Sequence, residues 1–416
     1  MNTQQDNVVD LKKRISEESK SVLDALVQEG ARRMLQTALE QEVAEYIERH
    51  VTERDSDGRR QVVRNGSMPE RQVMTAAGPL EIKQPRVDDR RSGKRFSSAI
   101  LPPYMRRSPS LEVLLPVLYL KGISTGDFSE AFEAILGRDA AGLSQTTISR
   151  LKQDWSRQYR QWRQRDVSHK KYVYVWADAV YLQVRLSQDR PCMLVLIGAT
   201  EDGRKEILAI EQGVRESELS WQDLLLDLRR RGLKQLGKLA IADGALGFWQ
   251  ATSKVYPGIA QQRCWVHKTA NILDKVPKKI QPQVKKMIHE MYLSDTKSDA
   301  LQVFEDFVSL YGAKYPRAVE CLVKDKEALF AFYDFPAEHW QHLRTTNPIE
   351  STFATVRHRT RQTRGCGSVE TITSMVFKLA LQAEKRWRRL RGYGLIPKVM
   401  NGTRFKDGHE VKEKAA

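Results

Sequence analysis

The sequence predicts a mixed α/β fold, in which one mixed sheet is flanked and interrupted by helical segments. Three strand-like runs follow one another between Lys171 and Gly213, and then come an amphipathic helix and a further apolar strand. Helical periodicity dominates before and after this stretch. At 416 residues, 41% of them hydrophobic, the chain is long enough for about two to four domains with packed cores.

Charge is concentrated near the C-terminal end of the chain. The formal net charge is +17, which predicts a polyanionic partner. Residues 1–60 contain 10 Lys/Arg and 13 Asp/Glu, a net of −3, whereas residues 344–416 contain 16 and 6, a net of +10. This asymmetry indicates a localised basic surface rather than a uniformly basic protein.

Hydropathy and cysteine usage argue against a membrane or secreted protein. No apolar run is long enough to span a bilayer, and the chain does not start with a charged-then-apolar signal peptide. The four cysteines are scattered, which favours reduced thiols in the cytoplasm. They are Cys192, Cys264, Cys321 and Cys366.

The N-terminal hundred residues predict a helix followed by a small β structure. From Ile15 to Ile47 apolar residues recur at steps of three and four, which is typical of an amphipathic helix. Its apolar stripe is most simply a core face, and a self-association surface is the alternative. Residues 71–87 predict a short hairpin that turns at Gly78, and the polar residues 88–97 predict a basic linker.

A helix-turn-helix is predicted between residues 110 and 155. The helical runs FSEAFEAILG and GLSQTTISRLKQDW are separated by a turn that contains glycine, and Ser144 is placed to cap the second run. The alternative is an ordinary helical hairpin, because this motif is weak by itself. The residues that would face DNA are Ser144, Gln145, Thr147, Ser149 and Arg150.

The order of the strands and helices after residue 170 predicts a particular sheet topology. Three strands joined by short turns should pair antiparallel. The crossover helix of residues 216–232 then makes the fourth strand, residues 238–244, parallel to the first strand and adjacent to it. This is the element order of a ribonuclease-H-like sheet. Residues 271–335 are mostly helical and predict an insertion before the sheet domain is completed.

These patterns together predict the following organisation: 1–60, an N-terminal helical region and candidate dimerisation surface; 61–97, a small β hairpin and basic linker; 98–168, a helix-turn-helix DNA-binding domain; 169–270, the first part of a ribonuclease-H-like core; 271–342, a helical insertion; 343–395, the second part of the core with a basic helix; 396–416, a C-terminal tail.

Two aspartates fall at unusual places in the predicted sheet. Asp178 lies in an apolar strand. Under two-residue periodicity it shares one face with aromatic and apolar side chains, which are Tyr172, Tyr174, Trp176, Val180 and Leu182. A charge buried there needs compensation, and a salt bridge or a local turn is the simple explanation. Asp243 ends the fourth strand, where Asp-Gly is commonly only a turn. Because neighbouring strands lie about 4.8 Å apart, both aspartates could face one metal ion.

Glu350 is the third carboxylate of interest. It lies in the first turn of a helix, in TTNPIESTFATVRHRTRQTR. With Asn347 as N-cap and Pro348 at the first helical position, Glu350 could simply complete a capping box. Alternatively it completes a set of carboxylates for two Mg²⁺ ions, which activate a water or a 3′ hydroxyl for in-line attack on phosphate. We found no Ser-His-Asp or Cys-His arrangement that offers a protein nucleophile.

The helix after Glu350 is basic and predicts phosphate contacts beside these carboxylates. Its four arginines are Arg357, Arg359, Arg361 and Arg364, and Arg344 precedes the helix as a further DNA-contact candidate.

The chain resembles the bacterial transposases of the Mutator-type insertion-sequence family, from about Arg32 to Gly408. The resemblance rests on the stretches WADAVYLQVR, LVLIGATEDGRKEILAIEQGVRES, IADGALGFW, QRCWVHKTANIL, FPAEHWQHLRTTNPIESTFATVRHRT and MVFKLALQAEKRWRRL. It implies a DDE transposase whose ribonuclease-H-like core is interrupted by a helical insertion. It also implies catalytic and metal-binding roles for Asp178, Asp243 and Glu350.

The family's Cys-x-x-His element falls on Cys264 and His267, for which the resemblance implies active-site support and DNA contact by His267. Zinc is the alternative, with His339 and His342 as a second ligand pair. Two positions depart from the family pattern. Gln183 stands where lysine is frequent, and Ala242 stands where glycine is frequent.

We therefore expect a bacterial cytoplasmic, nucleoid-associated enzyme that uses two Mg²⁺ ions, with Mn²⁺ as a substitute. Its partners would be the double-stranded DNA of terminal inverted repeats and of the target, bound by a homodimer, with no membrane contact. The resemblance implies a replicative route through a circular intermediate. The alternatives are a catalytically silent DNA-binding regulator and a structure-specific nuclease on the same fold.

Overall fold

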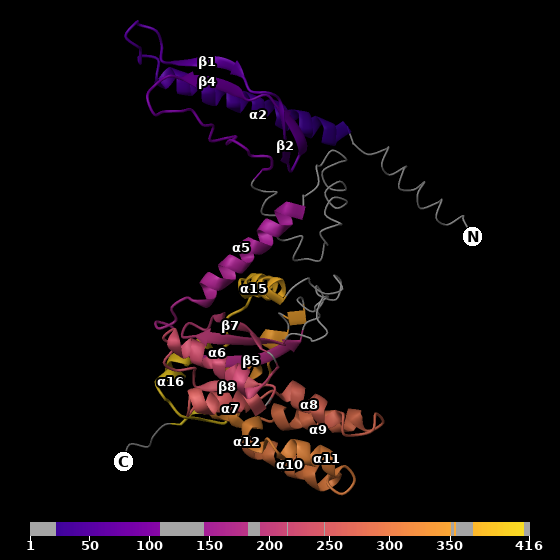
Figure 1. The fold of residues 1–416 in the computed structure, drawn as a ribbon. Coiled ribbons are helices and arrows are strands. Elements are labelled where there is room, and N and C mark those ends of the chain that lie inside the picture. Colours follow the sequence, from indigo (N-terminus) through magenta and orange to yellow (C-terminus); the bar gives the residue numbers. More distant parts are fainter. Residues whose placement is uncertain are drawn as a thin grey trace, which may run out of the picture. The chain divides into compact units, whose positions relative to one another are not determined.

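The computed structural model describes residues 22–108, 145–181, 192–213, 215–244, 246–350, 353–354 and 369–411. The chain divides into two compact units, residues 1–151 and residues 152–416, whose elements are drawn in Figure 1. Among the helices in these ranges, none combines the length and the apolar character that crossing a membrane requires.

The first unit is built on a long helix that packs against four short strands. The helix predicted from Ile15 to Ile47 is confirmed over its described part as α2 (Val22–Arg49). The predicted hairpin is also confirmed, because β2 and β3 pair antiparallel and Gly78 begins β3 with a φ of +96°. A second antiparallel pair, β1 with β4, was not predicted. The strands are β1 (Val62–Ser67), β2 (Arg71–Thr75), β3 (Gly78–Ile82) and β4 (Pro85–Asp89).

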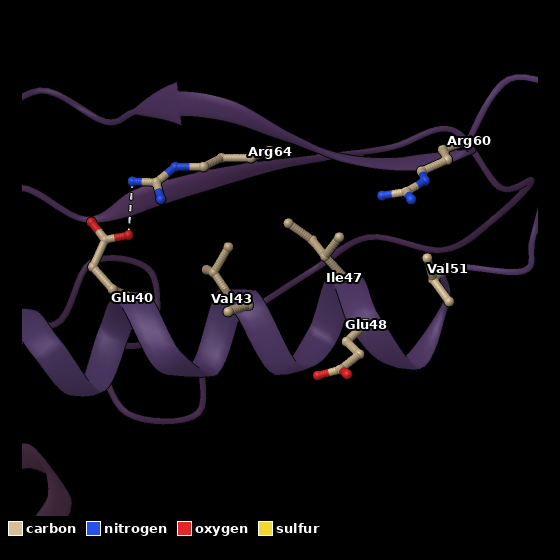
Figure 2. Close-up of a pocket in the computed structure, with 8 residues that line it drawn as sticks. Glu40, Val43, Ile47, Glu48, Val51, Arg60 and Arg64 are labelled. Atoms are coloured by element: carbon tan, nitrogen blue, oxygen red, sulfur yellow. Dashed lines mark ion pairs between the residues drawn. The ribbon is translucent and has the colours of Figure 1, made fainter.

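Side chains do not fill all of the space between α2 and these strands. Leu39 and Val43 are buried. Nearer the C-terminal end of α2, a cavity of about 350 Å³ remains between the helix and the segment from Arg60 to Arg64 (Figure 2). Arg64 pairs with Glu40 at a distance of 2.7 Å on its rim.

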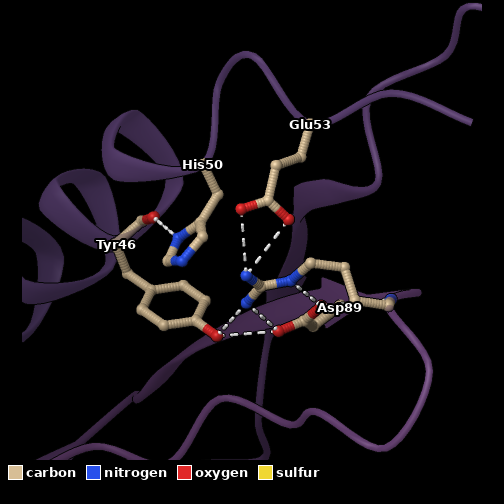
Figure 3. Close-up of polar contacts among 5 residues, drawn as sticks. Tyr46, His50, Glu53 and Asp89 are labelled. Atoms are coloured by element: carbon tan, nitrogen blue, oxygen red, sulfur yellow. Dashed lines mark hydrogen bonds and ion pairs between the residues drawn. The ribbon is translucent and has the colours of Figure 1, made fainter.

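The segment predicted as a basic linker is held in place by one arginine. The Arg91 side chain is only 8% exposed, and its guanidinium pairs with Asp89 at 2.7 Å and with Glu53 at 3.2 Å (Figure 3). It also donates to the Tyr46 hydroxyl at 2.6 Å, and that hydroxyl in turn donates to Asp89. These contacts tie residues 89–91 to the C-terminal end of α2.

The second unit contains a five-stranded sheet in the order β7-β6-β5-β8-β9. β5, β6 and β7 pair antiparallel, and β8 runs parallel to β5 beside it, as predicted. β9 extends the parallel part. The strands are β5 (Tyr172–Tyr181), β6 (Cys192–Thr200), β7 (Lys205–Gly213), β8 (Leu239–Ala242) and β9 (Ala260–Arg263).

Two helices cover one face of this sheet. Trp221 and Leu225 of α6 (Glu218–Arg230) pack with Phe248 of α7 (Leu246–Val255) and with alternate residues of β5, β6 and β8. The opposite face carries Tyr174 and Trp176 of β5, whose polar atoms bond to His339 and to the His342 carbonyl.

Tyr172 does not share the face of Tyr174, although two-residue periodicity predicts that it should. The pairing of β5 with β6 shifts register between Tyr172 and Tyr174. Tyr172 consequently joins the core beneath α6 and α7. The face prediction was therefore wrong at this residue, because an irregularity in strand pairing changes which side chains share a face.

The helices predicted for residues 271–335 are present, and this helical region is tied to β9 by a buried glutamine. The Gln262 side chain of β9 donates to the Leu329 carbonyl and accepts from the Phe332 amide, at 3.1 and 2.8 Å. The helices of this region are α8 (Trp265–Leu273), α9 (Gln281–Leu293), α10 (Lys297–Tyr311), α11 (Pro316–Val323), α12 (Lys326–Leu329), η1 (Ala331–Asp334), η2 (Ala337–His339) and α13 (Trp340–Leu343).

Helix α5 (Gln145–Arg163) starts at the residue after the predicted cap, which confirms the second helix of the proposed motif. Its C-terminal half packs in the second unit, where Tyr159 donates to the Ile210 carbonyl and Trp162 contacts Phe377. Residues 109–144, which would contain the first helix of the motif, lie outside the described residues. The last elements are α15 (Val369–Glu384), η3 (Tyr393–Leu395), α16 (Ile396–Met400), β10 (Phe405–Lys406) and β11 (His409–Glu410).

The Arg91 network predicts the effect of a conservative substitution. Arg91→Lys keeps the charge but loses the forked geometry that reaches Asp89, Glu53 and Tyr46 together. We expect amide hydrogen exchange in residues 50–61 and 85–95 to become at least about tenfold faster, as for loss of a charged hydrogen bond. Arg90→Lys is the control, because the Arg90 side chain is exposed and its ion pair is with Asp88, two residues away on the same segment. Equal protection in both variants would contradict the role given to Arg91.

Candidate active site

Asp178 lies inside β5 and is neither in a turn nor in an ion pair. It pairs with Val195 of β6 in the middle of the strand, and only 8% of its surface is exposed. One carboxylate oxygen accepts the Ala179 amide at 2.8 Å. Among the described residues no cation forms a salt bridge with Asp178, so neither a turn nor an ion pair within this part of the chain accounts for the residue.

Asp243 follows β8 at the register position beside Asp178. The parallel pairing of β5 and β8 runs up to Ala177 opposite Ala242, and the next residues are the two aspartates. Gly244 does make the turn that an Asp-Gly pair suggests, since its φ is +84°. A Cβ at Gly244 would overlap the Arg263 guanidinium. Asp243 therefore both precedes a turn and lies beside Asp178.

Glu350 is not placed as the capping-box alternative requires. Residues 347–350 are helical, and the first helical bond runs from the Glu350 amide to the Thr346 carbonyl at 3.2 Å. Asn347 is thus already inside the helix, and Glu350 falls four residues after Thr346. The Glu350 carboxylate instead accepts the Thr346 hydroxyl at 3.2 Å and lies 3.6 Å from His267 Nε2.

The three carboxylates act on one another electrostatically. Burial raises the pKa of Asp178, His267 opposes this rise and the negative charges of Asp243 and Glu350 add to it, so that the pKa is about 6. Asp243, at the end of β8, and Glu350, at the helix start, are therefore near enough to act on the charge of Asp178, and we call the three residues the acidic cluster. Among the described residues, the three possible ligand atoms that lie within 4.8 Å of one another are nevertheless those of Cys264, His267 and Glu350, not those of the three carboxylates.

Cys264 and His267 border this acidic cluster at the start of α8. Burial would raise the pKa of the Cys264 thiol, but hydrogen bonds with His267 and Thr346 outweigh it and lower the pKa. The same contact with Cys264 raises the pKa of His267 to about 9, with help from both aspartates. Ligand atoms of Cys264, His267 and Glu350 all lie within 4.8 Å of one another. His267 is therefore a cation that opposes the negative charge of Asp178 and Glu216.

The second histidine pair of the zinc alternative is engaged elsewhere. His339 uses both ring nitrogens, with Nδ1 on the Tyr174 hydroxyl at 2.7 Å and Nε2 on the Gly392 carbonyl at 2.9 Å. His342 Nε2 accepts the Arg391 amide at 3.1 Å. Both nitrogens of His339 are thus engaged, so this histidine does not join Cys264 in a four-ligand zinc site as the alternative requires.

Glu216 is a fourth carboxylate that the sequence analysis missed. Burial raises its pKa to about 8, and Asp243 and Asp178 add to the rise. It follows β7, whose last residue, Gly213, is level with the C-terminal end of β5 through Cys192. Because β5, β7 and β8 are parallel to one another, their C-terminal ends share one sheet edge. An acidic residue just after the third strand was the available signal.

The predicted DNA-contact residues fall into three groups. Ser144 and the four arginines from Arg357 to Arg364 lie outside the described residues, as does Gln183. Arg344 is half-buried and stacks over Phe332 and Trp340, at 4.7 and 5.2 Å from their ring centres. The remaining candidates, Gln145, Thr147, Ser149 and Arg150, occupy the first two turns of α5, where Arg150 is exposed.

The acidic cluster predicts a pH-dependent stability effect. With a pKa raised from 4.5 to about 8, Glu216 keeps its proton in the folded chain between these pH values but releases it on unfolding. It therefore destabilises the metal-free fold increasingly as pH rises through this window. We expect Glu216→Gln to stabilise the chain on the order of 2 kcal/mol at pH 9, allowing for partial exposure, and to have little effect at pH 4.5.

The measurement is thermal unfolding in EDTA at both pH values. Glu218→Gln is the matched control, because Glu218 is paired with Lys254 at 2.5 Å and its loss should not stabilise the chain. A gain that is equal at pH 4.5 and pH 9 would show that the pKa of Glu216 is not raised in the folded chain.

Comparison with known proteins identifies the family. The family model described as "Transposase, Mutator family" matches residues 2–389. The chain is 48% identical over 295 residues to the transposase for insertion sequence element IS6120 of Mycolicibacterium smegmatis, which covers 71% of this chain and 91% of that protein.

Two further relatives extend the match. The transposase for insertion sequence element IST2 of Acidithiobacillus ferrooxidans is 45% identical over 281 residues, covering 67% of this chain and 94% of that protein. The transposase for insertion sequence element IS256 in transposon Tn4001 of Staphylococcus aureus is 27% identical over 384 residues, covering 89% of this chain and 95% of that protein. The chain belongs to the Mutator family of insertion-sequence transposases.

Proposed function

We propose that this transposase is a DDE enzyme that binds the terminal inverted repeats of its own insertion sequence and catalyses Mg²⁺-dependent strand cleavage and strand transfer. The observation that supports this most directly is the electrostatic coupling of Asp178 with Asp243 and Glu350, which are far apart in the chain. The antiparallel β5-β6-β7 run with β8 parallel to β5 supports a ribonuclease-H-like core around them.

The donor set fits hard divalent cations. Asp178, Asp243 and Glu350 offer only carboxylate oxygens, the ligands that Mg²⁺ and Mn²⁺ prefer. Two bound ions would supply positive charge at the scissile phosphate and at its attacking and leaving oxygens. The protein's own part is to hold these carboxylates at one sheet edge, with His267 balancing their charge, and to orient the DNA.

DNA would be held by two elements that are far apart in the sequence. Helix α5 and the segment before it form the proposed helix-turn-helix, with Ser144, Gln145, Thr147, Ser149 and Arg150 toward the bases. The arginines from Arg357 to Arg364 neutralise phosphates near the carboxylates, so binding should weaken steeply with salt. His267 and Arg344 complete the proposed set of DNA contacts.

Two transposon ends must be handled together, which favours a homodimer on DNA at the bacterial nucleoid. In α2, Leu26, Val27 and Met34 are more than half exposed and are the candidate dimer contacts. We propose a replicative route through a circular intermediate. Products from a donor plasmid separated on a gel test the route, and excision by double-strand cuts at both ends alone would contradict it.

A substitution at Asp178 tests the catalytic assignment. Asp178→Ala removes a carboxylate ligand, and we expect the rate of cleavage and strand transfer on DNA carrying the element's ends to fall about 1,000-fold or more. Binding to the same ends in EDTA should stay within about twofold of the unsubstituted chain, since end recognition rests on other residues. Rates of strand transfer and gel-shift affinities are the two measurements.

The same strand-transfer assay, together with a cleavage assay on branched DNA and footprinting on the element's ends, separates the two alternatives. A catalytically silent regulator would bind the ends and show no Asp178-dependent strand transfer. A structure-specific nuclease would cut branched DNA without terminal repeats and leave no footprint on the element's ends. Undiminished strand transfer by Asp178→Ala would remove the DDE assignment itself.

A further inference from the structure

Thr346 is the buried residue on which the contacts around Glu350 converge. It has no exposed surface. Its hydroxyl oxygen lies 3.2 Å from Glu350 Oε1, 3.5 Å from Cys264 Sγ and 3.5 Å from His267 Nδ1. A threonine hydroxyl has one hydrogen to donate, and of these three neighbouring atoms the carboxylate oxygen of Glu350 is the nearest and the strongest acceptor.

The backbone around Thr346 is bonded to the turn that carries Cys264. The Thr346 amide donates to Cys264 Sγ at 3.4 Å, and the Trp265 amide donates to the Arg344 carbonyl at 2.9 Å. The Cys264 amide in turn donates to the Ala242 carbonyl at 2.8 Å. A continuous set of bonds therefore joins the residue before the second aspartate to the start of the helix that carries the glutamate.

Glu350 needs such support because its side chain is long and only loosely held. The side chain is 28% exposed, and the distance from its carboxylate to His267 Nε2, 3.6 Å, is too long for a hydrogen bond. Without the Thr346 hydroxyl as a fixed donor, side-chain entropy would favour rotation of the carboxylate toward solvent. The Thr346 hydroxyl is a fixed donor, since the residue is buried and its amide is held by Cys264.

We propose that Thr346 is a positioning residue whose hydroxyl, held by Cys264, keeps the Glu350 carboxylate at the acidic cluster before the metal ions bind. This proposal rests on the proposed function, because the position of Glu350 matters for chemistry only if it is a metal ligand. It goes further by assigning a task to the contact between the Cys264 turn and the helix start.

The test compares two substitutions at one buried position. Thr346→Val keeps the β-branched shape and removes the hydroxyl, whereas Thr346→Ser keeps the hydroxyl. We expect Thr346→Val to bind Mn²⁺ about tenfold more weakly, as for loss of a hydrogen bond to a charged group. The Mg²⁺ concentration for half-maximal strand cleavage should rise by a similar factor, and Thr346→Ser should stay within about threefold of the unsubstituted chain.

Mn²⁺ binding is measured on the full chain without DNA, from the electron paramagnetic resonance signal of the free ion. Thr252→Val is the matched control, because Thr252 is equally buried but its hydroxyl bonds to the Phe248 carbonyl within α7. It should leave Mn²⁺ affinity unchanged. Thr346→Ala repeats the test if the valine variant does not fold.

A double substitution tests whether Thr346 acts through Glu350. In a Glu350→Ala background, Thr346→Val should cause no further loss of Mn²⁺ affinity, whereas a general structural effect would add to the loss. The proposal is overturned if Thr346→Val binds Mn²⁺ normally, if Thr346→Ser is equally impaired, or if the two losses add. If Asp178→Ala and Glu350→Ala themselves bind Mn²⁺ normally, the proposed metal site fails instead.

Discussion

The constraint on which this site depends is the mutual repulsion of carboxylates gathered at one edge of a sheet. Asp178 is nearly buried, and Asp243, Glu350 and Glu216 lie within its electrostatic range. Such a cluster opposes folding unless positive charge is supplied. In the described chain His267 supplies part of it, and the divalent cations that we propose for this site would supply the remainder.

Keeping these carboxylates together requires hydrogen bonds between segments that are far apart in the sequence. The insertion separates Asp243 from Glu350 in the sequence, yet its two ends are fastened to the same turn. Gln262 and Trp265 hold the insertion through the Leu329 carbonyl, and the Trp265 amide bonds to the Arg344 carbonyl. The chain therefore leaves the sheet after β9, passes through the helical region and comes back to the turn at Cys264 and Trp265.

Much of the sheet could be predicted from the sequence because its signals are local. Period-two apolar runs, short turns and the right-handed crossover rule are enough to place β8 beside β5 and hence Asp243 beside Asp178. The β1–β4 pair, in contrast, was missed because β1 is largely exposed and shows no clear apolar alternation. The irregular pairing at Tyr172 was missed because a register shift leaves no compositional trace.

The sequence by itself determined the family, the antiparallel run of β5 to β7 and the place of β8 beside β5, because motif residues and periodicity are properties of short stretches. Only the tertiary structure decided that Glu350 faces Thr346 and His267 instead of capping its helix. It also added Glu216 to the cluster and occupied His339 and His342 elsewhere. Those outcomes depend on which side chains meet across the sheet edge, and the energies of burial and repulsion that govern them arise only once distant segments have packed.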